Sequence, residues 1–445
     1  MADLETQLRQ YTKSALDHVE PVRADEIMTT ERLPRGRRGR ARVAVAIAAS
    51  VLLVGSGALW IVSRDSGDQV RVTSQSGASP APTHWTQTAS LDTTLSNITA
   101  VPGGIVATGY GGIWFSSDAR SWKNVLTPEL PGGSPPSVSD VVATSHGLVA
   151  VGTAGEPGTN HGVAAVWTSP DGRAWTRVRD SALEPSTPPI PSNNTSPDRS
   201  SIVAIVRGGP GLVAIGEVFS GTFNGPTLVT SCCTPTVWTS RDGSTWTRID
   251  KAGDPGGRFV DAVVRHGTVF ALASTVNGTD VSKSNDGAHW QHVGIVRGSV
   301  SSVAIHGNTL VAVGSIAAAN RNERAVIWTS RAGVTWRQVY AEPSAPITDY
   351  NSVVSNGRWL VVVGYRGRFE VRTPGVMAIS KDAKHWAEVR RDGDVFTSHA
   401  YLNSSTAFGQ GFVAVGTAST GAGTASDPVQ SHTVVFGSNL KSART

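Results

Sequence analysis

Short segments of alternating apolar and polar residues, separated by glycine-containing turns, recur along residues 84–437. Such alternation predicts β-strands with one face buried, and a short break that contains Gly predicts a hairpin between two of them. The clearest unit holds four strand-sized segments: 138–145, 148–154, 163–169 and 173–178. Its breaks include the dipeptide His146-Gly147 and a Pro-Asp-Gly turn. The pattern predicts a four-stranded antiparallel meander.

The same four-segment unit recurs along the chain. Further copies lie at 95–125, 200–249, 258–293, 299–339 and 350–389. A seventh copy begins at Tyr401 and lacks its fourth segment, whereas residues 84–88 (HWTQT) resemble the fourth segment TWTRI of another copy. Pairing the two chain ends would remove two exposed strand edges. We therefore predict an all-β fold, a seven-bladed β-propeller of four-stranded antiparallel blades over 84–438, with 84–88 completing the last blade.

An uncharged apolar run, VAVAIAASVLLVGSGALWIV, precedes the repeats at 43–62. As a helix it would cross a hydrocarbon core of about 30 Å. Arginines crowd residues 32–42, so the positive-inside rule predicts a cytoplasmic N-terminus and extracytoplasmic repeats. A cleaved signal peptide is the alternative, although residues 1–42 make a long leader for one.

These features predict five regions in a single-pass protein of the cell membrane. They are a cytoplasmic tail with a short amphipathic helix and an Arg-rich end (1–42), a transmembrane helix (43–62), a flexible stalk (63–83), the propeller (84–438) and a C-terminal tail (439–445). The stalk is rich in Ser, Gly and Pro, and its reach is roughly 25 Å.

A serine stands six residues before a tryptophan in six of the units, usually with Asp and Gly between them. Two copies are nearly alike, TSPDGRAWTRV from Thr168 and TSRDGSTWTRI from Thr239. One active site does not need six copies, so we assign the motif a structural role in a tight turn. The positions with this role are Asp118, Asp171, Asp242, Asp286, Asp382, Trp122, Trp175, Trp246, Trp290, Trp336 and Trp386.

This motif resembles the Asp-box, or BNR repeat, of sialidase-like β-propellers, and the chain resembles a membrane-anchored bacterial member of that family. The resemblance covers most of residues 84–437, although these boxes are one residue shorter than the common Ser-x-Asp-x-Gly-x-x-Trp form. Ala332 replaces the Asp of one copy, and Ala119 and Ala383 replace the Gly of two others. The resemblance implies a turn held by Ser and Asp, a glycine with positive φ, and a tryptophan buried between neighbouring blades.

The strand order of a meander sorts its connections onto two faces of the ring. One-to-two and three-to-four turns, which include the boxes, are short and define what we call the short-turn face. Two-to-three and four-to-one connections define the long-loop face. Its long segments are 179–199, 219–236, 317–325, 366–375 and 418–431. Long loops on a rigid scaffold often carry binding residues, so we predict the ligand site there.

The candidate ligand-binding residues are Asp140, Arg258, Asp261, Tyr350, Arg366 and Tyr401. Two of them also belong to a series of small polar residues, one in the innermost strand of each unit. The series is Asn97, Asp140, Ser201, Asp261, Ser302, Ser352 and Ser404. These side chains either bond between blades or hold channel waters. The alternative is that Asp140 and Asp261 contact a ligand or cation.

Charge and cysteine content narrow the possible functions. The net charge of +5 is not concentrated on one basic face of the repeats, so we expect no nucleic-acid partner. Zinc-type His/Cys spacings and EF-hand patterns do not occur, so we expect no metal and no cofactor. Cys232 and Cys233 are the only cysteines, and they form a vicinal disulfide, remain thiols or bond to another chain.

Anchor, stalk and a closed ring with one face of long loops predict a non-catalytic binding or scaffolding module for an envelope protein or a cell-surface glycan. The family resemblance implies an alternative, a sialidase-like glycoside hydrolase with an arginine triad, a Tyr–Glu pair and an Asp acid/base. The family's Phe/Tyr-Arg-Ile-Pro segment is absent here, so we assign no catalytic residue. Scattered candidates for such a site are Arg199, Arg258, Arg366, Arg391, Tyr350, Tyr401 and Glu370.

The N-terminal tail supports a third hypothesis. Apolar residues from Leu4 to Val19 follow a helical stripe that ends before Pro21. A tail in this position is similar to that of short-tailed membrane anti-sigma factors, which would make the protein a transmembrane sensor with a cytoplasmic regulator bound through residues 1–20. The alternative is a helix that rests on the membrane surface.

Overall fold

A computed structural model of the chain describes residues 81–126, 135–155, 162–184, 195–224, 227–250, 257–318, 323–342, 348–367, 375–389, 400–420 and 430–440. The predicted tail, transmembrane helix and nearly all of the stalk (1–80) lie outside these residues. Within the described ranges, no helix is long and apolar enough to span a membrane. One 3-10 turn, η1 (Ser181–Leu183), is described there.

The described strands form seven four-stranded antiparallel sheets, which confirms the predicted seven-bladed propeller. Blade 1 holds β2 (Leu95–Val101), β3 (Gly104–Gly109), β4 (Gly112–Ser116) and β5 (Lys123–Asn124). Blade 2 holds β6 (Ser137–Thr144), β7 (Gly147–Gly155), β8 (Gly162–Ser169) and β9 (Thr176–Arg177). Blade 3 holds β10 (Thr195–Gly208), β11 (Gly211–Asn224), β12 (Thr227–Ser240) and β13 (Thr247–Asp250).

The remaining blades follow the same order. Blade 4 holds β14 (Arg258–Arg265), β15 (Thr268–Thr275), β16 (Gly278–Ser284) and β17 (Gln291–Val296). Blade 5 holds β18 (Ser299–His306), β19 (Thr309–Ala317), β20 (Glu323–Ser330) and β21 (Arg337–Ala341). Blade 6 holds β22 (Thr348–Ser355), β23 (Leu360–Arg366), β24 (Gly375–Ser380) and β25 (Ala387–Glu388). Blade 7 joins β26 (Ala400–Phe408), β27 (Gly411–Thr420) and β28 (Gln430–Ser438) to β1 (Trp85–Leu91).

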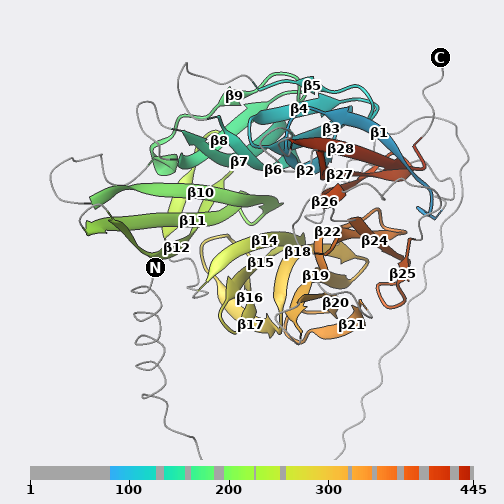
Figure 1. Cartoon of the computed structure of the whole chain (residues 1–445). Coiled ribbons are helices and arrows are strands. Elements are labelled where there is room, and N and C mark those ends of the chain that lie inside the picture. Colours follow the sequence, from blue (N-terminus) through green and yellow to red (C-terminus); the bar gives the residue numbers. More distant parts are fainter. Residues whose placement is uncertain are drawn as a thin grey trace, which may run out of the picture. The chain divides into compact units, whose positions relative to one another are not determined.

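The blades lie around a common centre, with the first strand of each nearest the middle (Figure 1). Each inner strand contacts the inner strand of the next blade, and β26 contacts β2, so the series closes on itself. The hydrophobic core lies between the blades. In the interface of blades 1 and 2, Val106 and Phe115 pack with Leu148 and Trp167. A strand such as β3 is buried at every residue because neighbouring blades cover both of its faces.

The three most deeply buried tryptophans lie in third strands, although Trp114 of the third strand β4 is half-buried. Trp167, Trp238 and Trp328 are at most 3% exposed. Among the box tryptophans only Trp246 is fully buried, and the five others are half-buried. The half-buried rings, such as Trp175, pack against the rims of the cores between blades. The implied deep burial of the box tryptophan is therefore wrong for most copies.

Blade 3 differs from the predicted boundaries. The segment 219–236, expected to be a long loop, is mostly strand, because β11 and β12 pair through it as far as Asn224↔Thr227. The strand β10 likewise begins at Thr195, inside the expected loop 179–199. An antiparallel hairpin satisfies the backbone groups of an insertion, so the added residues continue the sheet.

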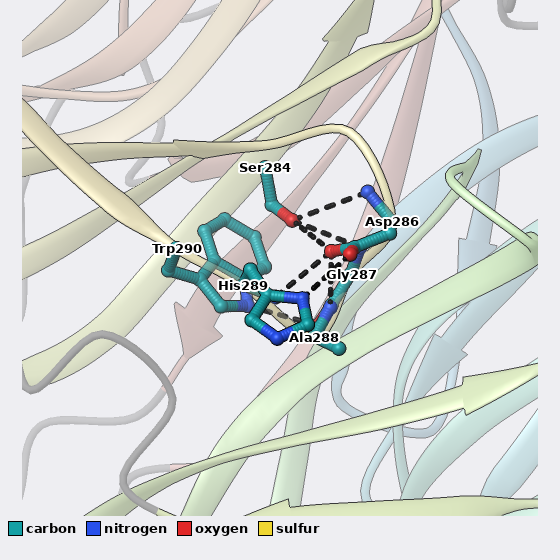
Figure 2. Close-up of polar contacts among 6 residues, drawn as sticks. All are labelled: Ser284, Asp286, Gly287, Ala288, His289 and Trp290. Atoms are coloured by element: carbon teal, nitrogen blue, oxygen red, sulfur yellow. Dashed lines mark hydrogen bonds and ion pairs between the residues drawn. The ribbon is translucent and has the colours of Figure 1, made fainter.

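Each predicted box is a tight turn after a third strand, and Figure 2 shows the box of blade 4. Ser284 Oγ accepts the Gly287 N–H at 2.9 Å and donates to Asp286 Oδ1 at 3.1 Å. Asp286 Oδ1 accepts the N–H groups two and three residues later, at 2.9 and 2.8 Å. Trp290 Nε1 donates to the Gly287 carbonyl at 2.9 Å. The polar residues thus satisfy backbone groups within the turn.

Two boxes carry alanine where the others carry glycine. Ala119 and Ala383 have φ values of 61° and 60°, in the left-handed region that favours glycine. Their box tryptophans, Trp122 and Trp386, have buried Nε1 atoms with no hydrogen-bond partner among the described residues. In the four glycine boxes the same atom donates to the glycine carbonyl. These two turns therefore combine a strained backbone with the loss of the hydrogen bond that the tryptophan Nε1 donates in the glycine boxes.

The predicted closure is confirmed. Strand β1 pairs antiparallel with β28, beginning at Trp85↔Ser438. The closure also builds a seventh box-like turn from both chain ends, because Ser438 ends a third strand as the box serines do. Trp85 Nε1 donates to the Pro82 carbonyl, three residues earlier, at 2.8 Å. Asn439 Nδ2 donates to the Ala81 carbonyl at 3.2 Å, so residues from both termini hold this turn.

We expect Trp85→Ala to lower the free energy of unfolding by about 3–5 kcal/mol, because it empties a buried ring site and removes a bond at the closure. Chemical denaturation followed by far-UV circular dichroism measures this loss. Trp122→Ala is the control, since its ring is half-buried and its Nε1 lacks a partner. Equal losses for the two variants would contradict a special role of the closure.

Ala332 leaves the box of blade 5 without the carboxylate that Asp242 provides to the N–H groups of Ser244 and Thr245. We expect Ala332→Asp to raise the free energy of unfolding by about 1 kcal/mol, because it adds an acceptor for the same turn positions. Asp242→Ala should lower the free energy of unfolding by a similar amount. Urea denaturation of both variants measures the changes, and a loss for Ala332→Asp would show that the turn does not use the carboxylate.

Candidate functional site

The candidate residues occupy two separate places in the ring. Asp140 and Asp261 lie on the inner strands β6 and β14. Tyr350, Arg366 and Tyr401 lie at the strand ends of blades 6 and 7 on the long-loop face.

Arg258 stands apart from both groups. At the start of β14 it makes a two-pronged ion pair with the buried Glu217 of blade 3, with Nε–Oε2 at 2.8 Å and Nη2–Oε1 at 2.5 Å. Its guanidinium also lies 5.6 Å from the ring centroid of Phe219. An arginine held in this way by a neighbouring blade serves the blade interface.

The inner polar residues link one blade to the next. Asp140 Oδ2 accepts the N–H of Ile205 at 3.0 Å, and Asp261 Oδ2 accepts the N–H of Val303 at 2.8 Å. In the same way, Ser352 Oγ accepts the Ser405 N–H at 3.2 Å. Each of these residues follows a register shift in its inner strand, a β-bulge that can re-aim one side chain. The contacts support the interpretation that these side chains bond between blades.

Ser201 does not belong to this series. In β10 the register shift falls between Ile202 and Ala204, so Ala204 takes the position that Asp140 holds in β6. Alanine has no side-chain acceptor, and blade 3 therefore lacks the inner link that the equivalent side chain makes elsewhere. The assignment of Ser201 was wrong because the shift cannot be located from the alternation pattern alone.

The two inner aspartates have raised pKa values. Burial raises the pKa of Asp140 to about 7, and the charge of Asp261 adds to the rise, whereas the bond from the Ile205 N–H opposes it. Burial also raises the pKa of Asp261 to about 6, against the bonds from the N–H groups of Val303 and Ala262. Both carboxyls keep part of their surface accessible, yet surrounding protein dominates their solvation.

A buried carboxylate gathers Tyr350 and Arg366 at the interface of blades 5 and 6. Glu342 is 3% exposed and accepts the hydroxyl groups of Tyr340 and Tyr350, each at 3.2 Å. Arg366 pairs with Glu342 and, at 3.2 Å, with Glu388. Burial and the charge of Glu342 raise the pKa of Tyr340 to about 12 and that of Tyr350 well above its usual value.

This network does not provide the nucleophile that a sialidase-like mechanism requires. Tyr350 is 1% exposed, so a substrate cannot reach its hydroxyl without displacement of neighbouring side chains. Its raised pKa makes the phenolate scarce at neutral pH. Arg366 is held by two carboxylates, so it does not stand open to a substrate carboxylate. The geometry indicates a structural ion-pair network between two blades.

Tyr401 belongs to a second, more accessible group. Its ring stacks on that of Tyr365 across blades 6 and 7, with centroids 4.3 Å apart and an interplanar angle of 23°. Both tyrosines are half-buried. Asp349 pairs with Tyr365 across the strands β22 and β23, and its Oδ1 has no hydrogen-bond partner among the described residues. Burial and the charge of Glu323 raise the pKa of Asp349 to about 7.

The residues that the sequence analysis missed are the partners of those it named: Glu217, Glu342, Asp349 and Tyr365. Glu217 and Tyr365 stand next to long segments of the long-loop face, which was the available signal, whereas Glu342 and Asp349 stand at the connection between blades 5 and 6. Alternation could not show which carboxylate meets which arginine, because the partners come from different blades. For the cysteines, the side chain of Cys232 lies outside the described residues, and Cys233 is half-buried.

Among the residues that the structure describes, no cluster of three or more His, Cys, Asp or Glu side chains could hold a metal ion.

The two inner aspartates predict a pH dependence of stability. Their folded pKa values of about 7 and about 6 exceed the ordinary value near 3.9, so folding favours their protonated forms. Their contribution to stability is therefore greatest below about pH 4 and is lost as the pH rises towards 7. As the pH rises from about 4 to about 7, the melting temperature of wild type should therefore fall relative to that of the variant Asp140→Asn/Asp261→Asn. A difference that stays constant with pH would contradict the raised pKa values.

Comparisons with known proteins give similarity of structure only. No protein-family profile matches the chain, and no curated protein matches it. A computationally designed protein is 12% identical, with 78% of this chain and 99% of that chain covered and a TM-score of 0.39. Trypanosoma rangeli sialidase is 11% identical, with 79% and 59% covered and a TM-score of 0.38. Penicillium chrysogenum alpha-L-arabinanase is 12% identical, with 66% and 91% covered and a TM-score of 0.36. At these scores the similarity carries no argument about what the chain binds or catalyses.

Proposed function

We propose that the protein is a membrane-anchored, extracytoplasmic binding or scaffolding module that holds an envelope glycan or protein on its long-loop face. The apolar run at 43–62 and the arginines before it support the anchor and the orientation. The Asp-box resemblance supports a structural role for the turns on the opposite face. A closed ring of seven sheets offers a rigid platform for the ligand-contacting residues.

The observation that carries this proposal is the Tyr365–Tyr401 pair beside Asp349. Two half-buried aromatic rings provide an apolar surface with polar tips, a combination suited to amphipathic ligands such as sugars. The neighbouring residue Asp349 is half-buried, so its carboxyl adds a polar group beside the aromatic surface, although its Oδ1 atom is itself buried. A glycan provides both an apolar ring face and hydroxyl donors.

The structure supports the hydrolase alternative less than it supports a binding module. It needs an accessible nucleophile and a free arginine cluster, whereas Tyr350 is buried and the arginines Arg258 and Arg366 are paired with glutamates of neighbouring blades. The sensor alternative depends on residues 1–20, which lie outside the described residues. Each alternative has a direct test, namely hydrolysis of a fluorogenic sialoside and transcription after removal of residues 1–30.

We expect Tyr401→Ala to weaken retention of purified cell-wall glycan or a solubilised envelope protein by about tenfold, because it removes half of the aromatic surface. The measurement is an affinity pull-down with full-length protein in detergent. Tyr110→Ala is the control, since Tyr110 is 63% exposed on the same face in blade 1, away from the pair. Equal retention by wild type and Tyr401→Ala, with the same melting temperature, would refute the site.

The same pull-down separates binding by the propeller from signalling by the tail. A chain that lacks residues 1–42 should retain the envelope ligand, because the site lies in blades 6 and 7. A cytoplasmic regulator captured only by the full chain would instead support the sensor hypothesis.

A further inference from the structure

The direction of β1 shows from which face the N-terminal segment leaves the propeller. Strand β1 is the fourth strand of blade 7, and every fourth strand starts on the short-turn face. Its first residue, Trp85, pairs with Ser438 at the end of β28, and Ser438 pairs with Phe412 beside the turn that joins β26 to β27. All three residues lie on the short-turn face. Residues 63–80 therefore connect to the propeller at the face that carries the boxes, and the long-loop face lies opposite this attachment.

The turns of the short-turn face carry exposed cations. In the boxes these are Arg120, Arg173, Arg241, Arg331, Lys381 and Lys384. The one-to-two turns add arginines, including the exposed Arg207 and Arg358, and contain no Asp or Glu. Cations thus outnumber carboxylates on this face, which differs from the expectation that the charge of the repeats is not concentrated on one face.

The carboxylates of this face bond to groups of their own turns, although their side chains stay about half exposed, and Asp171 also pairs with Arg173 at 3.5 Å. In the box of blade 3, Asp242 Oδ1 accepts the N–H groups of Ser244 and Thr245 at 2.7 and 2.9 Å. These bonds lower the pKa of Asp242, so it stays ionised with its charge turned to backbone donors. The same arrangement holds Asp382 in the box of blade 6. The exposed cations exceed these carboxylates in number, so the face presents a net positive charge to an approaching surface. Val334, 55% exposed in the box of blade 5, adds one apolar side chain.

We propose that the short-turn face is the membrane-proximal face and docks on an anionic lipid surface, so that the long-loop face points away from the membrane. This inference rests on the proposed membrane anchor at 43–62. The stalk that follows the anchor has a reach of roughly 25 Å, which holds the face at a high effective concentration near the bilayer. Lysine and arginine side chains close to anionic lipid are attracted within about 8 Å, the screening length at physiological ionic strength.

The orientation gives the two faces separate tasks. The short-turn face, with uniformly short connections, presents a basic surface to lipid headgroups. The long-loop face, which carries the Tyr365–Tyr401 pair, remains accessible to envelope ligands.

Hydrogen–deuterium exchange of the full chain in two kinds of lipid vesicle tests this proposal. One vesicle holds phosphatidylcholine alone, and the other holds equal parts of phosphatidylcholine and phosphatidylglycerol. We expect amide exchange in the turns 241–245, 331–335 and 381–385 to be at least about threefold slower in the anionic vesicles, and the effect to vanish near 1 M salt, where the screening length is about 3 Å. The connection at Val276, fully exposed on the long-loop face, should exchange equally in both. Equal exchange of the three turns in both vesicles would overturn the proposal.

Matched charge variants identify the face that docks. Arg241→Ser/Lys384→Ser removes two exposed cations from the short-turn face and should abolish most of the protection in anionic vesicles. Arg297→Ser/Arg324→Ser removes two exposed cations from the long-loop face and should leave it unchanged. Protection lost equally in both variants would overturn the assignment of the face and leave only a general charge effect.

Alkaline carbonate extraction distinguishes failure of the docking face from failure of the anchor. Release of the chain from vesicles by carbonate would refute the membrane anchor, and the docking proposal would fall with it. A chain that resists extraction while its short-turn face stays unprotected would refute the docking proposal alone.

Discussion

The pairing of β1 with β28 is the interaction on which the rest of the structure depends. It joins residues as distant in the chain as Thr88 and Val435, which are 347 positions apart. A row of blades whose ends did not meet would leave two exposed edges and two uncovered apolar faces. Because β1 comes from the N-terminal end and β28 from the C-terminal end, blade 7 is complete only when both ends are in place. The box-like turn shared by Trp85, Asn439 and their neighbours holds this junction.

Two kinds of contact then connect the blades. Apolar side chains of adjacent sheets form a separate core at each interface, and the inner polar side chains bond to backbone N–H groups of the following blade. The inner bonds carry a cost where the side chain is an aspartate, because burial disfavours its ionised form. Ser352 accepts a backbone N–H in the same way without a charge, and Asn97 instead donates its amide to the Ser139 carbonyl of the following blade. Among these inner residues, the two aspartates therefore make the stability of the propeller depend on pH.

The polar groups of the long-loop face fall into two sets: groups bonded to other protein groups, and groups that remain accessible to a ligand. Glu217 and Glu342 are buried and fully engaged with arginines and tyrosines of adjoining blades, which makes them part of the framework. The Tyr365–Tyr401 pair and Asp349 are half-buried and keep accessible surface, which makes them suited to a ligand. The opposite face has short turns whose carboxylates bond within the turn, so its exposed cations determine its character. Chain direction at β1 ties this basic face to the N-terminal segment.

The sequence by itself determined the blade number, the four-strand unit, the box turns and the closure, because each of these depends on local alternation and on a repeat that residue types display directly. Only the tertiary structure decided that Ala204 and not Ser201 takes the inner position of blade 3, because a β-bulge shifts the register without any mark in the alternation. It also decided which carboxylates pair with Arg258 and Arg366 and that Tyr350 is buried. Those outcomes depend on which strand ends of different blades lie next to each other. The packing of the closed ring decides this, and spacing along the chain does not.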